Sequence, residues 1–353
     1  MIQERAFTLT QRPRRLRATA ALRDLVAETF VRPTDLVTPF FVVSGTDKAE
    51  PVGTLPGVAR LSPDRLLREL ERGLKLGVRA AMLFGVVPGE LKDPAGSRAG
   101  DPNGPVAEAL RAARRAFGND LVLMSDVCLC GYTDHGHCGL LRPTPRGVVI
   151  DNDPSLEALA RMAVVHAEAG ADLVSPSDMM DGRVGVLRGA LDRAGFEQTG
   201  ILAYTVKYAS AFYGPFRDAA GSKPNTSTPG TGALLPDELL PPKDRRTYQM
   251  DPRNPREAAL EVTLDEAEGA DMLMVKPVMA YLDILYRVRQ ASPLPVVAYH
   301  VSGEYAALKA ASAVGALDEP AAVHETLTAI KRAGADLIIS YYALEAAEKG
   351  WLG

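Results

Sequence analysis

From about residue 36 onward, short apolar runs alternate with longer amphipathic stretches. Eight apolar runs are predicted to be strands, at residues 36–43, 80–86, 120–127, 172–177, 201–209, 271–277, 295–302 and 336–342. Most of them are unbroken rather than alternating, as expected of parallel strands that are covered on both faces. The stretches between them have helical periodicity, as at residues 63–77, 155–170, 254–269 and 319–334. This alternation predicts an α/β fold with a parallel sheet.

The tripeptide Gly-Ala-Asp recurs where a predicted helix ends and a predicted strand begins, at residues 170–172, 269–271 and 334–336. Glycine suits the left-handed position that follows a helix. Recurrence in the same structural position indicates a repeated βα unit. With eight strands and about eight helices, we expect a single (β/α)8 TIM barrel. The alternative is a doubly wound open sheet, but no GxGxxG motif follows the first strand to support it.

Three segments depart from this rhythm, and one of them, residues 128–153, contains the cysteines. Residues 1–35 are predicted to form an N-terminal extended arm for subunit contacts, and residues 36–353 the TIM-barrel catalytic domain. The arm contains RPRRLR at 12–17, which we interpret as a solvated basic run rather than a nucleic-acid site. Within the barrel, residues 214–250 are rich in Gly, Pro, Ser and Thr. A segment of that length is typical of a lid, so we predict one there.

Composition narrows the class of protein. The chain has 353 residues, of which 46% are hydrophobic and 24% charged, as in soluble globular proteins. Its net charge of −4 gives no reason to expect nucleic acid as a partner. The N-terminus has no apolar signal region, and no apolar run approaches the length of a membrane span. We therefore expect no membrane partner and a cytoplasmic location.

Two lysines interrupt apolar strands. The chain has only ten lysines among its forty basic residues, yet Lys207 lies in the run at 201–210 and Lys276 in the run at 271–279. Arginine keeps its proton at ordinary pH, whereas a desolvated lysine loses it. A buried lysine is thus a candidate amine nucleophile that forms a Schiff base with a carbonyl substrate. Two such lysines suggest two carbonyls, or one lysine that assists the other. The alternative for Lys207 is a strand-end lysine that reaches solvent.

Polar residues gather at the predicted carboxyl ends of the strands, where catalytic groups of TIM barrels project. They are Asp126, Ser177, Asp178, Asp181, Lys207, Lys276, Ser302 and Tyr341. Adjacent strands lie about 4.7–4.9 Å apart, so two ammonium groups there would repel each other. Repulsion and burial both lower an amine pKa, which favours a neutral and nucleophilic lysine.

All three cysteines fall within eleven residues, at Cys128, Cys130 and Cys138, with His135 and His137 nearby. An odd and clustered set argues for a metal or catalytic role rather than a disulfide framework. Three thiolates suit zinc and leave its fourth position open for water or substrate. The alternative is three small buried thiols without a metal. We expect His137 to lie outside the ligand set, in contact with it.

Three arginines lie in or beside the predicted lid: Arg217, Arg245 and Arg246. Guanidinium groups bind carboxylates through two parallel hydrogen bonds, although arginines in loops are commonly solvated. The hydroxyls of Ser302 and Tyr341 are candidates for a second carboxylate site, or for satisfying nearby backbone groups. Glu261, within a predicted helix, has the pattern of a solvated residue.

Seven longer stretches invite comparison with known families. They are DVCLCGYTDHGHCG, SPSDMMDGRVG, YTVKYASAFYGPFRDA, TYQMDP, DMLMVKP, YHVSGEYA and RAGADLIISYY. In this order, from about residue 10 to the C-terminus, the chain resembles the δ-aminolevulinic acid dehydratase (porphobilinogen synthase) family. The resemblance implies a hydro-lyase of tetrapyrrole and heme biosynthesis that condenses two 5-aminolevulinate molecules with loss of two waters. It also implies a TIM barrel whose arm embraces a neighbouring subunit, within a homo-octamer.

The resemblance further implies roles for individual residues. Lys276 forms a Schiff base with the substrate that becomes the propionate side, and Lys207 with the other substrate. Residues implied to hold the two carboxylates are Ser302 and Tyr341 for the first and Arg217 and Arg245 for the second. Residues implied to line the site are Asp126, Ser177 and Asp178. The residues implied to bind metals are Cys128, Cys130 and Cys138 for catalytic zinc and Glu261 for an allosteric magnesium.

Two features depart from the family pattern. Thr247 stands where some animal members have a cysteine that helps bind a second zinc, so that site is not expected. The stretch 222–243 is longer than the usual lid connection, which makes the match of Arg245 weaker than that of Arg217. Two other functions are alternatives: a class I aldolase, which needs one imine lysine and no thiolate metal site, and an inactive barrel with structural zinc and a binding role.

Overall fold

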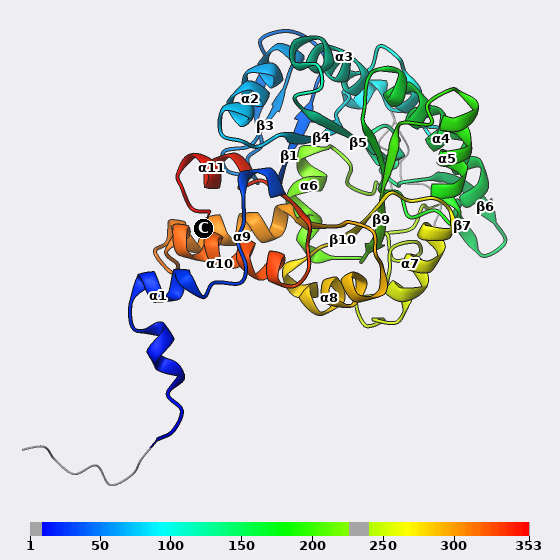
Figure 1. Ribbon diagram of the computed structural model, residues 1–353. Helices are drawn as coiled ribbons and strands as arrows, with labels where there is room; N and C mark the ends of the chain where they lie inside the picture. The colour runs from blue at the N-terminus through cyan, green and yellow to red at the C-terminus, as the bar shows by residue number, and fades with distance from the viewer. Residues whose placement is uncertain (1–8, 226–239, 353) are drawn as a thin grey trace, which may run out of the picture.

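The computed structural model describes residues 9–225 and 240–352. Eight parallel strands form a closed ring, in which β12 pairs with β1 through Leu36 and Ile338. In ring order they are β1 (Leu36–Val42), β4 (Ala80–Gly85), β5 (Val122–Val127), β8 (Leu173–Pro176), β9 (Gly200–Lys207), β10 (Met272–Lys276), β11 (Val296–His300) and β12 (Leu337–Ser340). Helices surround this ring (Figure 1). The predicted TIM barrel and all eight predicted strands are confirmed.

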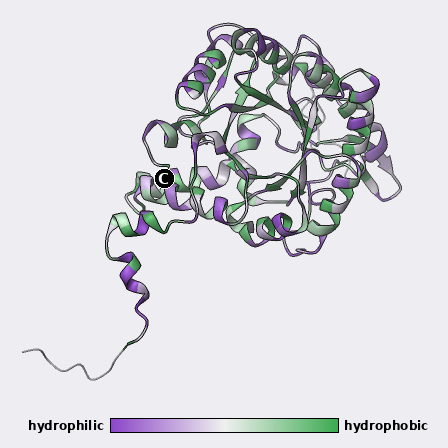
Figure 2. Ribbon diagram, viewed as in Figure 1, coloured by the Kyte–Doolittle hydropathy of each residue, from purple (hydrophilic) through white to green (hydrophobic). Residues whose placement is uncertain are grey.

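The helices of the barrel follow its strands in turn. They are α2 (Pro63–Lys75), α3 (Pro105–Phe117), α4 (Asn152–Glu168), α5 (Arg183–Arg193), α6 (Gly214–Ala219), α7 (Glu257–Ala267), α8 (Leu282–Ala291), α9 (Ser302–Ala313), α10 (Glu319–Arg332) and α11 (Ala343–Glu348). Every residue of β1 is buried, as are seven of the eight in β9. Apolar residues concentrate on the strands and on the inner helix faces (Figure 2). No helix among the described residues is long and apolar enough to cross a bilayer.

The repeated Gly-Ala-Asp tripeptide has the same structural role each time. Its glycines adopt φ of 105°, 98° and 116° at Gly170, Gly269 and Gly334, where a non-glycine residue is disfavoured. Each aspartate accepts an N–H from the preceding strand of the barrel: Asp172 from Leu123, Asp271 from Ile201 and Asp336 from Val296. The glycine of the tripeptide therefore ends a helix, and its aspartate forms a hydrogen bond that joins the start of one strand to the neighbouring strand.

Two hairpins that the sequence analysis did not predict extend the barrel. One joins β2 (Ala49–Pro51) to β3 (Ala59–Leu61), which also pairs with β1. The other joins β6 (Leu140–Thr144) to β7 (Gly147–Asp151) after the cysteine segment. Three predicted strands, β9, β11 and β12, end two residues earlier than expected. β11 ends at His300, so Ser302 begins α9, and β12 ends at Ser340, so Tyr341 follows it.

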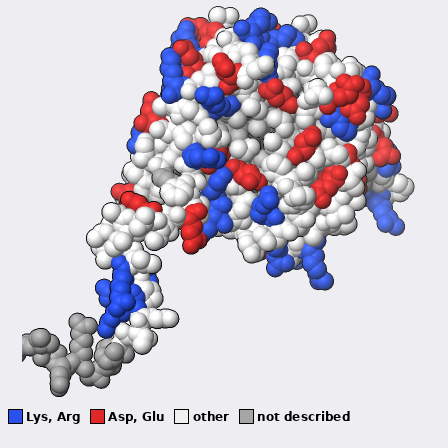
Figure 3. All heavy atoms as spheres, viewed as in Figure 1, with Lys and Arg blue, Asp and Glu red and all other residues white. Residues whose placement is uncertain are grey.

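An arm extends away from the barrel before Val31, whereas Val31 and Asp35 are buried against it (Figure 1). The arm contains short helices at Pro13–Arg17 and Ala20–Leu25 (α1), and another, Pro33–Asp35, follows it. Leu16 and Leu25 are 53% and 78% exposed. Basic residues gather on the arm, whereas charges of both signs mix on the visible face of the barrel (Figure 3). Residues 1–8 of the predicted arm and 226–239 of the predicted lid lie outside the described residues.

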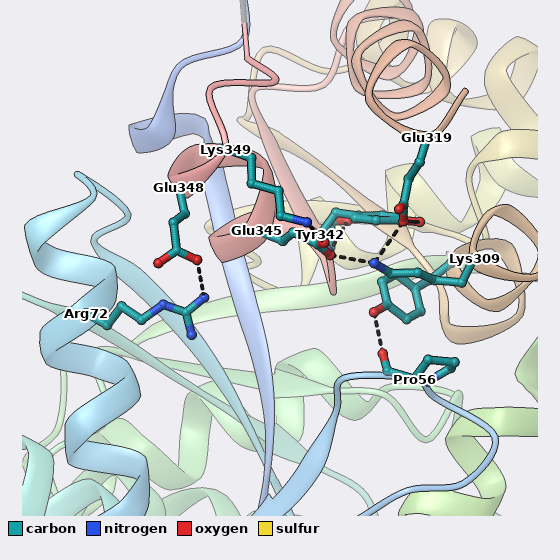
Figure 4. Close-up of polar contacts among 10 residues, drawn as sticks. Pro56, Arg72, Lys309, Glu319, Tyr342, Glu345, Glu348 and Lys349 are labelled. Atoms are coloured by element: carbon teal, nitrogen blue, oxygen red, sulfur yellow. Dashed lines mark hydrogen bonds and ion pairs between the residues drawn. The ribbon is translucent and has the colours of Figure 1, made fainter. Parts of the chain in front are cut away.

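The C-terminal helix α11 is fastened to the barrel wall by ion pairs (Figure 4). The Lys309 Nζ of α9 lies 2.8 Å from a Glu319 oxygen and 2.6 Å from a Glu345 oxygen, which joins α9, α10 and α11. Glu348 pairs with Arg72 of α2 at 3.0 Å. We define Lys309, Glu319 and Glu345 as the Lys309 cluster. The Lys309 cluster holds α9, α10 and α11 together on the outside of the barrel.

Candidate active site

Lys207 and Lys276 are the last residues of β9 and β10, and the two are register partners in the sheet. Each residue is only 4% exposed. Proline at position 277 interrupts the ladder directly after Lys276. The two amines are therefore buried side by side at the carboxyl-end rim of the barrel, as the strand pattern predicts.

Four aromatic rings surround the amine of Lys276. Its Nζ lies 4.2, 4.9, 5.1 and 5.4 Å from the ring centroids of Tyr299, Phe216, Tyr204 and Tyr213. We define these four residues as the aromatic box. Burial, followed by repulsion from Lys207, lowers the pKa of Lys276 to about 7. A large fraction of this lysine is thus neutral near pH 7 and able to act as a nucleophile.

Lys207 lies against polar groups instead. Its Nζ donates a hydrogen bond to the carbonyl oxygen of Ser177, which follows β8. Asp126, on β5, has a buried carboxylate oxygen with no partner among the described residues. Burial, and then the nearby Cys130, raise the pKa of Asp126 to about 6. Asp178 accepts the N–H of Met180, and burial raises its pKa to about 6 as well. Both carboxyl groups are therefore able to exchange protons near neutral pH.

The three cysteines converge beside these groups. Cys128 follows β5, Cys130 lies in the turn Leu129–Gly131, and Cys138 precedes β6. All three are buried and free, and their sulfur atoms lie within 4.8 Å of one another. Zinc–sulfur bonds of about 2.3 Å place tetrahedral sulfur ligands about 3.8 Å apart. The sulfur cluster therefore fits a metal ion of this kind.

The predicted contact of His137 with the metal segment has a clear geometry. Its Nδ1 lies 3.1 Å from the Tyr248 hydroxyl, and its Nε2 lies 2.8 Å from the Pro242 carbonyl oxygen. Burial lowers its pKa to about 4, so the ring is neutral at pH 7. Because both ring nitrogens have other partners, the imidazole supports the segment around Cys138 rather than completing the sulfur cluster.

The three predicted arginines differ in their surroundings. Arg246 is exposed and pairs with Asp244 at 3.6 Å, as a solvated loop arginine does. Arg245 is only 4% exposed, and its Nη2 donates to the carbonyl oxygens of Gly136 and Ser222 at 2.8 and 2.6 Å. Burial opposes its charge, but Cys138 and Cys130 raise its pKa well above the usual value. Arg245 thus joins the cysteine segment to the chain that follows α6.

Arg217 lies on α6 near Arg245, and its Nε is buried without a hydrogen-bond partner among the described residues. It lines a cavity of about 1360 Å³ that opens between the loops after β1 and β4 and the end of α6. Burial, and then the charge of Arg245, lower the pKa of Arg217. Of the two arginines only Arg217 lines the cavity, where an anionic ligand would offset the repulsion that it feels from Arg245.

The two predicted hydroxyl ligands are buried. Ser302 Oγ accepts the N–H of Phe216 at 2.9 Å and donates to the Phe212 carbonyl oxygen at 3.3 Å. In this structure it therefore satisfies backbone groups, which was one of the two alternatives. The Tyr341 hydroxyl lies 3.3 Å from that of Tyr299 in the aromatic box. Both residues lie at the Lys276 side of the barrel rim.

Glu261 lies apart from this site, on α7. It lines a separate cavity of about 520 Å³ together with Asp181 and Glu257. Burial, and then the charges of Asp265 and Asp181, raise its pKa to about 7. The sequence-based expectation of a solvated residue is therefore wrong, because Glu261 is half-buried among other acids.

Three features were not predicted from the sequence: the aromatic box, a buried ion pair between Arg183 and Asp265 at 3.3 Å, and the buried carboxylate of Glu304. Three of the four rings of the box, Tyr204, Tyr213 and Phe216, lie within the stretch that also contains Lys207. That concentration of aromatics around a lysine was a usable signal. The sequence contains no signal for the burial of Glu304, because a glutamate in the first turn of a helix is common.

Comparison with known proteins gives a consistent result. The chain matches the family described as "Delta-aminolevulinic acid dehydratase" over residues 10–349. It is 49% identical to the delta-aminolevulinic acid dehydratase of Escherichia coli K12 over 341 residues, which cover 97% of this chain and 98% of that one. The Chlamydia pneumoniae relative is 48% identical over 338 residues, covering 96% of both chains.

A solved structure extends this similarity to the fold. The Toxoplasma gondii ME49 delta-aminolevulinic acid dehydratase (porphobilinogen synthase), in complex with the reaction product porphobilinogen, superposes with a TM-score of 0.88. It is 44% identical, with 97% of this chain and 92% of that chain covered. The chain therefore belongs to the delta-aminolevulinic acid dehydratase family.

Proposed function

We propose that this chain condenses two 5-aminolevulinate molecules into porphobilinogen with loss of two waters, as a hydro-lyase of heme biosynthesis. The observation that carries the proposal is the pair of buried lysines at the ends of β9 and β10, with the pKa of Lys276 near 7. The solved Toxoplasma relative, bound to porphobilinogen, supports the same reaction. Each lysine is assigned to one of the two ketone groups.

Lys276 forms the first imine in this proposal. Its neutral amine attacks the ketone carbon, the tetrahedral intermediate loses water, and the resulting imine anchors the substrate and withdraws electrons from it. The aromatic box excludes water that would hydrolyse this imine. Lys207 forms the second imine, which makes the subsequent bond-forming steps intramolecular.

Proton transfer around Lys207 is proposed to involve Asp126, Ser177 and Asp178. The two carboxyl groups, each with a pKa raised to about 6, can take a proton from a carbinolamine and return it to the departing water. The contact between Lys207 Nζ and the Ser177 carbonyl oxygen orients the amine. Proton transfer and imine formation therefore have separate groups at the same rim of the barrel.

The carboxylates of the two substrates are proposed to have different partners. Ser302 and Tyr341, on the Lys276 side, hold one of them, which requires Ser302 to exchange its backbone contacts for the ligand. Arg217 and Arg245 hold the other, and their mutual repulsion favours an anion between them. The lid is proposed to span residues 214–250, of which α6 and residues 240–250 are described.

We propose zinc at Cys128, Cys130 and Cys138, and magnesium at Glu261. Bound zinc supplies a Lewis acid that polarises a substrate oxygen or nitrogen. The buried, closely spaced sulfurs beside cationic Arg245 suit a thiolate-bound ion. At the second site, Asp181 and Glu257 add carboxylate oxygens of the kind that magnesium prefers. Magnesium at Glu261 would act from outside the barrel.

The arm is proposed to pack on a neighbouring subunit, in a homo-octamer that works in the cytoplasm. The exposed apolar residues Leu16 and Leu25 support a packing role, because the helices that carry them have no buried residue in the single chain. The barrel from residue 36 onward then forms the catalytic domain of each subunit.

Activity and trapping together test this function. Incubation with 5-aminolevulinate is expected to yield porphobilinogen, and borohydride is expected to reduce imines at Lys276 and Lys207, located by peptide mass. Labelling of one lysine, with turnover that persists in a chelator, would favour the aldolase alternative. Retention of zinc with no labelled lysine would favour a barrel with a binding role only.

A further inference from the structure

Glu304 is a buried carboxylate that the proposed reaction does not use. It is the third residue of α9 and is only 2% exposed. Among the described residues it forms no ion pair, and its oxygens accept hydrogen bonds from backbone N–H groups alone. Burial raises its pKa to about 7 in spite of these bonds. An unpaired buried carboxylate is costly to keep, so its placement calls for an explanation.

The two oxygens of Glu304 bind two different segments of the barrel rim. Oε2 accepts the N–H of Val301, which directly precedes Ser302, at 2.8 Å. Oε1 accepts the N–H groups of Val278 and Met279, at 3.2 and 2.7 Å. Val278 lies only two residues beyond Lys276. One carboxylate therefore joins the end of β10 to the start of α9.

The same joint continues to the aromatic box. Ser302 Oγ accepts the N–H of Phe216, whose ring lies 4.9 Å from Lys276 Nζ. The start of α9 also packs tightly on the loop after β9, since a Cβ at Gly303 would lie 2.5 Å from the Phe212 carbonyl oxygen. Lys276, Ser302 and Phe216 are thus held in one rigid unit, with the Glu304 carboxylate between the first two.

We infer that Glu304 is a positioning residue that fixes the distance between the Lys276 amine and the Ser302 hydroxyl, and so matches the imine nucleophile to the carboxylate of the same substrate. The inference rests on the proposed function, because it needs a ketone at Lys276 and a carboxylate at Ser302. Glu304 itself touches neither. Its contribution is to catalysis through geometry, where a displacement of about 1 Å costs roughly 100-fold in rate.

Two substitutions separate bridging from simple helix capping. Glu304→Asp is one methylene shorter, so it can still accept the Val301 N–H but withdraws from Val278 and Met279. Glu304→Gln keeps the length but has one oxygen, so it satisfies one segment and turns an NH₂ group toward the other. The matched control is Asp318→Ala on α10, which removes a cap that accepts the Ala321 N–H at 2.9 Å, on an exposed helix end.

The probe is 4-oxopentanoate, a keto acid of the same length that lacks the amine and thus reports imine formation at one site. Its borohydride-trapped adduct at Lys276 is measured by peptide mass over time and over probe concentration. We expect Glu304→Asp to slow the saturated trapping rate by roughly 10- to 100-fold, and Glu304→Gln by roughly tenfold. Asp318→Ala is expected to lower the melting temperature and leave the trapping rate unchanged.

The outcomes distinguish the inference from the function beneath it. If the unmodified chain gives no adduct at Lys276, the proposed function fails. The decisive comparison is made when the unmodified chain is labelled and both Glu304 variants melt at or below the melting temperature of the Asp318→Ala control. If these two variants are then labelled as fast as the unmodified chain, Glu304 is only a helix cap and the inference is overturned. Should the Asp variant fail to fold, the Gln variant decides the question by the same comparison.

Discussion

Lys276 and Lys309 both lie among aromatic rings, yet they differ in burial and in their charged neighbours. Lys309 Nζ lies 4.9 Å from the Tyr342 ring and pairs with two carboxylates, Glu319 and Glu345. Lys276 Nζ lies 4.2 Å from the Tyr299 ring, has no ion pair among the described residues, and has Lys207 as its neighbour in the sheet. Aromatic faces alone attract cations, so rings do not explain the difference.

The comparison shows that burial and charged partners together decide the role of a lysine that lies among aromatic rings. The carboxylates of Glu319 and Glu345 both pair with Lys309, which thereby joins three helices. The aromatic box removes water from Lys276 and offers no full negative charge in contact, while Lys207 opposes a second positive charge. The first arrangement suits a structural cation, and the second suits the nucleophile that we propose at Lys276.

The largest effect is expected from exchanging each lysine for methionine, which preserves length and apolar packing. Lys276→Met removes the imine-forming amine and should reduce porphobilinogen formation to the background rate. Lys309→Met should retain turnover, because the Lys309 cluster lies on the outer helices. An activity assay on both variants checks this. Substantial turnover by Lys276→Met would contradict the contrast between the two lysines.

Removal of one cysteine is expected to have the next largest effect. Cys130→Ala leaves two sulfurs, which is one ligand fewer than a catalytic zinc site needs. The variant should lose bound zinc and zinc-dependent turnover while it keeps the circular dichroism spectrum of the parent. Zinc content after dialysis measures the first effect. Full activity of the variant in the presence of a chelator would remove the metal from the account.

The influence of Lys207 on Lys276 can be measured by pH. Lys276 is a base whose pKa is lowered, so its neutral, reactive fraction rises as the pH rises through about 7. Lys207→Met removes the neighbouring positive charge, which should raise the pKa of Lys276 and move the midpoint of 4-oxopentanoate trapping up by about one pH unit. An unchanged midpoint would mean that burial alone sets the pKa of Lys276.

The smallest effect concerns stability. Lys309→Met leaves Glu319 without its cation, although Glu345 keeps an ion pair with Lys349 at 2.6 Å. Because the lysine and both glutamates are partly exposed, we expect a loss of about 1 kcal/mol in the free energy of unfolding. Denaturant unfolding at constant m-value measures it. A stability loss of the same size in Lys276→Met would contradict the contrast drawn above.

Much of the fold followed from the sequence because it depends on local pattern. Unbroken apolar runs identified all eight barrel strands, and glycine at 170, 269 and 334 marked helix ends correctly. The hairpin β6–β7 was missed because its residues are half-exposed or exposed and its apolar runs are only two and three residues long. The ends of β11 and β12 were placed too late, since a helix that starts at Ser302 continues the same buried pattern.

The part of the candidate site that depends on local sequence pattern was also predictable. Strand order alone brings Lys207 beside Lys276, because parallel strands end at the same rim. The contacts of Arg245 with Gly136 and of Glu304 with Val278 join segments distant in sequence, so no local pattern reports them. The burial of Glu261 likewise depends on its tertiary neighbours, which a helical period does not reveal.

The decisive measurement is the pH dependence of imine trapping at Lys276. In the unmodified chain, the rate of borohydride-trapped 4-oxopentanoate labelling at Lys276 is measured from pH 5 to 11, in steps of about one unit. A midpoint near 7 is predicted, with a plateau above it. A midpoint near the usual lysine pKa of 10.5 would show that the aromatic box and Lys207 do not keep this amine neutral, and would contradict the account.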